Sequence, residues 1–168
     1  MLILHTSDWH LGRSFKSTSL LGDQKAFINE LIEVVKGRRV DLVVIAGDIF
    51  DRGLPPAEAV VIWNDALARI IETGAQVVAI AGNHDQGERI EMKPALTNPA
   101  VVVRGTREAS LATMEFDDGP LTVVTVPFLD PFMARDLSQG EGAASHQSVI
   151  EGALAVVADE VAKSDRSL

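Results

Sequence analysis

The stretch Leu42-Val43-Val44-Ile45-Ala46-Gly47-Asp48-Ile49-Phe50-Asp51 decides the fold class, because a short apolar run ends in a glycine and then in polar side chains. An apolar run of this length predicts a buried strand of a parallel sheet. Two more runs have the same design: residues 2–5 precede Thr6-Ser7-Asp8-Trp9-His10, and residues 77–81 precede Gly82-Asn83-His84-Asp85. Such strands alternating with helices predict βαβ units, so we expect an α/β fold with a mixed, partly parallel sheet.

Helical patterns separate these strands. Asp23 is placed to cap a first helix, which carries apolar residues at helical spacing and ends near Gly37. A second helix begins after Pro55-Pro56 and is closed by Gly74. Farther along, three shorter strands are expected to form a second, more antiparallel sheet, followed by a last amphipathic helix. These elements are expected at residues 101–103, 109–114, 121–126 and 149–161.

The bulk composition bounds the class of protein. A length of 168 residues, with 46% hydrophobic and 23% charged residues, predicts one globular domain or a large piece of one. Because there is no cysteine, any metal must be bound by carboxylate, imidazole or amide groups. A net charge of −9 argues against a broad basic face for nucleic acid, although bound divalent cations can invert the local field. No signal-peptide or membrane-spanning pattern is present, so we expect a cytoplasmic protein without a membrane partner.

Polar side chains of metal-ligand type follow each of the three strands. Sites in open α/β sheets form outside the carboxyl ends of the strands, so the three turns converge if the strands are neighbours. Asp8 and His10 could bind one ion, and Asn83 could bind a second. Asp48, after the turn at Gly47, is a candidate for a carboxylate shared by both ions. Two divalent ions roughly 3.5 to 4 Å apart can clamp a phosphate and activate water for its displacement.

His84 is expected beside these ligands. Its imidazole could donate a proton to the leaving oxygen, with Asp85 orienting the ring. Asp51 is interpreted as a carboxylate that stabilises its loop or caps a helix rather than as a ligand. His5 is interpreted as a supporting histidine near the sheet, outside the set of ligands.

Some candidates have an ordinary structural explanation of equal weight. Arg13 and Arg52 follow the motif turns and could contact phosphates, but scattered surface cations are common. Trp9 and Phe50 are interpreted as packing residues, although a nuclease could use either to stack bases.

The ordered motifs Asp-x-His (Asp8, His10), Gly-Asp-x-x-Asp (residues 47–51) and Gly-Asn-His-Asp (residues 82–85) resemble those of the calcineurin-like metallophosphoesterase family. Within it, residues 4–13 and 46–51 together with Pro55-Pro56 are similar to the SbcD type of bacterial DNA exonuclease. The resemblance implies an αββα sandwich with two divalent metal ions, usually Mn²⁺, that hydrolyses phosphodiester bonds of DNA in break repair and recombination. It implies an SbcC-like SMC-type ATPase as partner and allows a homodimer. By the same likeness the metal ligands are Asp8, His10, Asp48 and Asn83, and His84 is the catalytic histidine.

The resemblance has one departure. The family has further histidine ligands downstream, one alone and two in a Gly-His-x-His motif, whereas only His146 follows His84 here. His146 precedes the pattern of the last helix and is interpreted as an exposed residue rather than a ligand. We therefore expect residues 1–168 to be the amino-terminal part of a metallophosphoesterase domain, incomplete at its carboxyl end and without a capping domain. Two alternatives stay open: a phosphoesterase for small phosphomonoesters or cyclic nucleotides, and an inactive fragment that only binds a partner.

Overall fold

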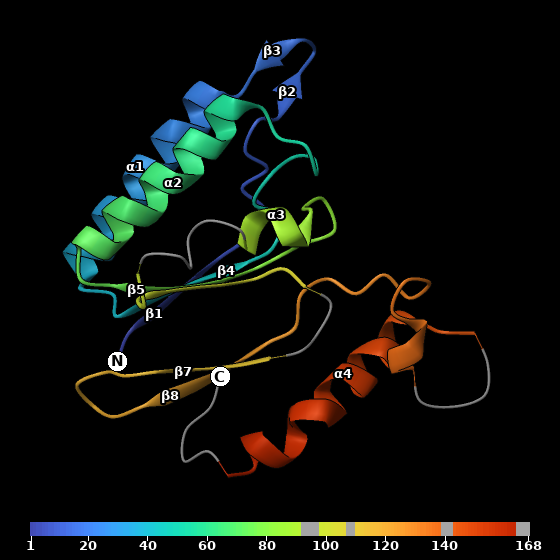
Figure 1. Cartoon of the computed structure of the whole chain (residues 1–168). Helices are drawn as coiled ribbons and strands as arrows, with labels where there is room; N and C mark the ends of the chain where they lie inside the picture. Colours follow the sequence, from blue (N-terminus) through green and yellow to red (C-terminus); the bar gives the residue numbers. More distant parts are fainter. Residues whose placement is uncertain (92–97, 107–109, 139–142, 164–168) are drawn as a thin grey trace.

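Four parallel strands form the central sheet, in a computed structural model that describes residues 1–91, 98–106, 110–138 and 143–163. The strands are β1 (Ile3–Thr6), β4 (Leu42–Ala46), β5 (Gln76–Ile80) and β6 (Val101–Arg104), and they lie side by side in that order (Figure 1). Each strand is parallel to its neighbour. All four carboxyl ends therefore lie at one edge of the sheet, and the α/β prediction is confirmed.

The prediction for residues 101–103 was wrong in one respect. These residues were expected in the second, more antiparallel sheet, but as part of β6 they pair in parallel with β5. Val101 and Val103 are buried against the helical side of the sheet, and Val102 packs against its other side. A strand covered on both faces has no polar face, which is typical of a parallel sheet.

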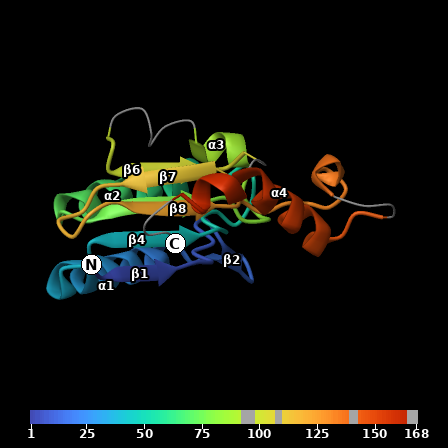
Figure 2. The ribbon, with the colours of Figure 1, turned by 90° about the horizontal axis from the view of Figure 1, so that it is seen from below.

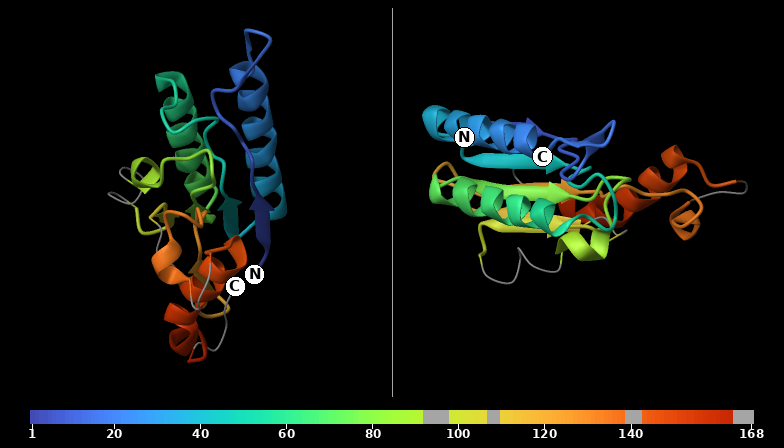
Figure 3. Two further views of the ribbon diagram at one scale, coloured as in Figure 1. Left: turned by 90° about the vertical axis from the view of Figure 1, so that its right-hand side faces the viewer. Right: turned by 90° about the horizontal axis from the view of Figure 1, so that it is seen from above.

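Two long helices, α1 (Leu21–Arg38) and α2 (Ala57–Glu72), cover one face of this sheet (Figure 3). The expected cap was wrong: Leu20 occupies the N-cap position without a side-chain hydrogen bond, and Asp23 lies in the first turn. A carboxylate there is still favourable, because the amino-terminal end of a helix carries partial positive charge. The helix also passes Gly37 and ends at Arg38. The second helix follows Pro56 and stops before Gly74, as predicted.

The other face of the sheet is covered by an antiparallel hairpin of β7 (Ser110–Met114) and β8 (Leu121–Thr125), as expected for the second sheet (Figure 2). Residue 109, where the first of these strands was expected to begin, lies outside the described residues. The hairpin and the sheet share a small apolar core, formed by Leu42, Val78, Met114, Leu121 and Val123. The layers thus run α, β, β, in the order that an αββα sandwich requires.

The remaining elements lie near the carboxyl edge of the sheet or beyond it. A small hairpin, β2 (Ser14–Phe15) with β3 (Thr18–Ser19), follows the first motif turn, and the short helix α3 (Gly87–Glu91) follows the third. After β8 come the 3-10 turn η2 (Arg135–Leu137) and helix α4 (His146–Val161). Within the described ranges, no helix combines the length and the apolar character that crossing a membrane requires.

Candidate metal centre

The first three strands deliver their motif turns to one place. Beyond the strands, the amide of Asp8 donates to the carbonyl of Gly47 at 3.1 Å, and that of His10 donates to the carbonyl of Asp48 at 2.9 Å. The ladder between β1 and β4 thus continues into the loops. The predicted convergence of the three turns is confirmed, because β1, β4 and β5 are direct neighbours.

Three candidate ligands adopt a backbone conformation that L residues rarely use. The φ angles are 58° at Asp8, 44° at His10 and 51° at Asp48, all in the left-handed region. Outside glycine, asparagine and aspartate this region is sparsely populated, and such residues cluster at functional sites. The loops are therefore bent in a way that local preference does not favour, and their mutual hydrogen bonds maintain the bend.

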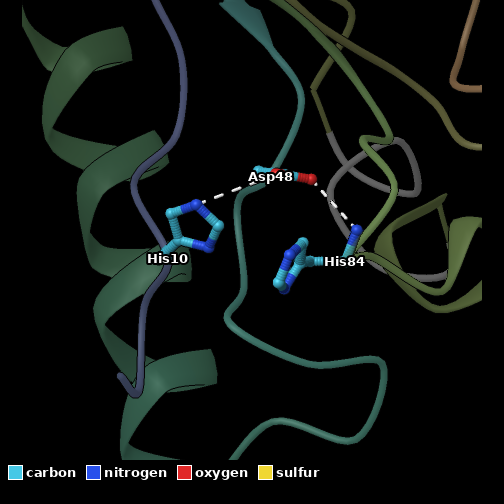
Figure 4. A group of neighbouring side chains, drawn as sticks. All are labelled: His10, Asp48 and His84. Atoms are coloured by element: carbon cyan, nitrogen blue, oxygen red, sulfur yellow. Dashed lines mark hydrogen bonds and ion pairs between the residues drawn. The ribbon is translucent and has the colours of Figure 1, made fainter. Parts of the chain in front are cut away.

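The side chains from these loops face one another (Figure 4). His10 Nε2 lies 3.8 Å from Asp8 Oδ1 and 3.7 Å from Asp48 Oδ2. Ligand atoms of His10, Asp48 and His84 all lie within 4.8 Å of one another. Two ligands of one ion, each about 2.0 to 2.2 Å from it, are roughly 3 to 4 Å apart. The mixed nitrogen and oxygen donors and their spacing therefore fit a divalent cation.

Asp48 lies at the centre of the group and is largely buried. Its Oδ1 accepts a hydrogen bond from the amide of His84 at 3.0 Å, while Oδ2 faces His10. Glycines make room for it: Gly47 has φ of 87°, and a Cβ on Gly82 would collide with the carboxylate of Asp48. The Gly-Asp and Gly-Asn-His motifs thus share one packing requirement, that two turns approach at backbone distance.

Asp85 has a different role from the predicted one. Its carboxylate accepts hydrogen bonds from the amides of Ile49 at 3.1 Å, Phe50 at 2.9 Å and Gly82 at 2.9 Å. It therefore joins the second motif turn to the third, and the prediction that it orients the ring of His84 was wrong. A carboxylate one residue after His84 satisfies these three amides because the turn directs it back under the loops.

The ring of His84 is oriented by a backbone carbonyl instead. Its Nδ1 lies 2.8 Å from the carbonyl oxygen of Asp51. A carbonyl can only accept, so Nδ1 carries a hydrogen and Nε2 is the nitrogen that gains or loses a proton. This bond raises the pKa of His84 above its ordinary value of 6.5, and the negative charges of Asp48 and Asp51 act in the same direction. The exposed ring lies edge-on to His10, with centroids 4.8 Å apart.

The surrounding charged candidates are less closely engaged. The carboxylate of Asp51 lies 3.8 Å from His10 Nδ1 and 3.9 Å from Arg13 Nε, so it stands beside the group as expected. Arg13 and Arg52 are exposed. His5 is exposed on β1 and, within the described part of the chain, forms no hydrogen bond or ion pair with the group. Its predicted supporting role receives no structural support.

Gln24 on α1 supports the first turn, and sequence reasoning missed it. Its side-chain nitrogen donates to the carbonyls of His10 at 2.6 Å and Trp9 at 3.2 Å, and its oxygen accepts from the amide of Gly12 at 3.1 Å. No local pattern marks a helical glutamine as such a clamp. The aromatic residues were correctly interpreted as packing: Trp9 and Phe50 are buried, and each contacts Trp63 edge-on.

Asn83 lies at a neighbouring pocket of about 390 Å³. Its exposed side chain lines this pocket together with Asp8 and Asp48. His146 was interpreted as an exposed residue, and it is exposed, but it lines the same pocket. Only the return of the chain through β8 and α4 brings it there, so its position in the sequence held no signal.

Known proteins are similar to this chain in the region of these motifs. The chain is 36% identical over 135 residues to the D subunit of the nuclease SbcCD from Escherichia coli K12, an alignment that covers 78% of this chain and 34% of that protein. It is 40% identical over 99 residues to the protein of the same name from Bacillus subtilis, covering 58% and 25%. The protein of that name from Rhodobacter capsulatus is 32% identical over 178 residues, covering 98% and 44%.

These alignments set the scope of the comparison. The chain spans about a third of the length of the E. coli protein and less than half of the others. The family model described as calcineurin-like phosphoesterase matches residues 1–132, a range that includes all three motif turns and the whole αββ arrangement. With most of its length matched by that model, the chain belongs to the calcineurin-like phosphoesterase family.

Proposed function

We propose that this chain contributes metal ligands and a proton donor to a DNA phosphodiesterase. In this proposal Asp8 and His10 bind one divalent ion, Asn83 binds a second, and Asp48 lies between both. The observation that carries it is the pair of distances of 3.7 and 3.8 Å from His10 Nε2 to two carboxylates. Mn²⁺ is the proposed metal. The expectation of further histidine ligands downstream remains a prediction.

The chemistry divides between the ions and the chain. When bound, such ions would polarise the phosphate and lower the pKa of a water molecule. His84 would deliver the proton of Nε2 to the leaving oxygen, because Nδ1 is engaged by the carbonyl of Asp51. Asp48 would also fix the amide of His84, which keeps the proton donor at a constant distance from the ligands.

DNA is the proposed substrate because the similar proteins are named as parts of a nuclease. By the same names we propose a complex with a second, SbcC-like ATPase, and a homodimer is a further proposal. The rival activity acts on small phosphomonoesters or cyclic nucleotides, and the net charge of −9 favours it.

The test measures metal binding and turnover separately. Calorimetry with Mn²⁺ should show binding that Asp48→Ala abolishes. With Mn²⁺, release of nucleotides from duplex ends should fall about 100- to 10,000-fold in His84→Ala, while metal binding persists. His5→Ala, which changes an exposed histidine away from the group, is the matched control. Hydrolysis of cyclic nucleotides without cleavage of DNA would support the rival, and absence of Mn²⁺ binding would refute the proposal.

A further inference from the structure

The pocket beside the candidate metal centre has two chemically different walls. One wall carries the proposed ligands Asp8, Asp48 and Asn83. The other comes from the loop after β8 and from the start of α4, and its main side chains are Pro127, Phe128, His146 and Ile150. A volume of about 390 Å³ falls within the range of roughly 300 to 1,000 Å³ that is usual for small-molecule sites. The space therefore exceeds what a phosphate group at the ligands would fill.

The second wall is fixed to the first by the backbone. The amide of Phe128 donates to the carbonyl of Ala81 at 2.9 Å, one residue before the turn that carries Asn83. Its neighbour Leu129 is 3% exposed and packs in a core with Val149 of α4. The loop and the helix therefore move as one unit with the edge of the sheet.

Phe128 is nevertheless exposed, at 44%, between two buried neighbours. Its ring centroid lies 5.9 Å from that of His146, and Ile150 lies one helical turn farther along α4. The firmly anchored loop thus presents an aromatic face to the pocket. Exposed aromatic rings beside a phosphate site are platforms on which nucleic-acid bases stack.

We propose that this pocket is a nucleoside subsite, which takes the base and sugar of the nucleotide whose phosphate lies at Asp8, Asp48 and Asn83. The base stacks on Phe128, and His146 hydrogen-bonds to the sugar or to the edge of the base. The inference rests on the proposed function for the position of the phosphate. It adds a substrate class, a nucleotide with its base unpaired, because a base within a duplex stack cannot reach such a wall.

The lining argues against other occupants. No lysine or arginine lines the pocket, so its second wall offers nothing to further phosphates. Within the described residues, the cluster with close ligand atoms is His10, Asp48 and His84, and His146 does not belong to it. Continuity with the proposed ligands selects a molecule that carries one phosphate and an aromatic group.

The first experiment needs no metal. Deoxyadenosine is titrated into the metal-free chain, and NMR shifts of the Phe128 ring and the His146 ring are followed. Both rings should respond in the wild type. Phe128→Ala should weaken binding about 5- to 100-fold, the range expected for the loss of one stacked base. Phe132→Ala is the matched control, because this phenylalanine is also exposed but lines a different pocket. Absence of saturable binding, or equal losses in both variants, would overturn the inference.

The second experiment separates this inference from the proposed function. The Mn²⁺-loaded chain is titrated with dAMP, deoxyribose 5-phosphate and inorganic phosphate. The subsite predicts that dAMP binds most tightly and that Phe128→Ala removes its advantage without changing phosphate binding. If phosphate binds but dAMP has no advantage, the subsite is wrong and the metal centre stands. If neither Mn²⁺ nor phosphate binds while deoxyadenosine does, the proposed function is wrong and the subsite stands.

Discussion

At the scale of single residues, the candidate ligands carry a conformational cost. Asp8, His10 and Asp48 all have positive φ, in a region that costs an L residue roughly 1 to 2 kcal/mol, with aspartate at the low end. Negative charges also face one another across the group when no cation is present. We infer that the metal-free protein is less stable than its fold would allow, and that these residues persist because of what they bind.

Replacing Asp8 by glycine tests this cost. Glycine adopts positive φ freely, and the change removes one carboxylate from the group. In EDTA, Asp8→Gly should raise the free energy of unfolding by about 1 kcal/mol, which corresponds to roughly 2 to 4 °C in Tm. Asp8→Asn, which removes the charge but keeps a side chain, is the control that separates strain from repulsion. A lower Tm for Asp8→Gly than for the wild type would contradict the interpretation.

The protonation of His84 can be measured directly. In the metal-free protein, an NMR titration of its ring should give a pKa above 6.5, because the carbonyl of Asp51 and the charge of Asp48 favour the protonated form. A pKa raised in the folded state means that the group stabilises the fold below pH 6.5, and that this contribution disappears as pH rises through the folded value.

Asp48→Asn is the variant that tests the cause of this shift. Asparagine tolerates the positive φ and keeps an oxygen that can accept from the amide of His84, but it removes the charge. The pKa of His84 should therefore fall in this variant while the ring keeps its place. An unchanged midpoint would show that Asp48 does not contribute.

At the scale of elements, helix α1 acts on the first turn through one side chain. Gln24 satisfies the carbonyls of Trp9 and His10 and the amide of Gly12, across 12 to 15 residues of sequence. The strand alone does not define how the chain leaves β1. The helix therefore determines the position of His10 as much as its own turn does.

Substitution of Gln24 should loosen this turn. In Gln24→Ala, the three backbone groups lose their partner, which should cost about 1 to 3 kcal/mol of stability. Mn²⁺ affinity should fall roughly 10- to 100-fold, as for other residues that support a ligand. Calorimetry and thermal unfolding measure the two effects. Lys25→Ala, at the next, exposed position of the same helix, is the control, and an equal loss there would rule out a specific clamp.

At the scale of the whole molecule, the site exists only when three strands are paired. Its ligands come from loops 40 and 35 residues apart, measured from Asp8 to Asp48 and from Asp48 to Asn83. An unfolded chain cannot gather them, so a cation that binds them binds the folded state alone.

Metal binding should therefore stabilise the entire fold. At a free Mn²⁺ concentration about 100 times its Kd, the folded state should gain about 2.7 kcal/mol. The Tm should rise with Mn²⁺ in a saturable manner in the wild type and remain constant in Asp48→Ala. Differential scanning calorimetry provides the measurement. A Tm insensitive to Mn²⁺ in the wild type would show that these residues do not form a cation site by themselves.

Two kinds of information met in this protein. The sequence alone determined the α/β class, the order of the first strands and helices, and the convergence of the turns that carry Asp8, His10, Asp48 and Asn83. Apolar runs and the glycines behind them act over a few residues, so local patterns report them. Residues 101–103 show the limit, because a short apolar run does not reveal which sheet it joins.

Only the tertiary structure decided how the site is supported. Asp85 joins amides that lie 3 to 36 residues away, the carbonyl of Asp51 orients His84 across 33 residues, and Gln24 reaches back from α1. These are pairings of a side chain with a distant backbone group, and the partner is known only once the layers are packed. For the same reason His146 joins the pocket only through the return of β8 and α4.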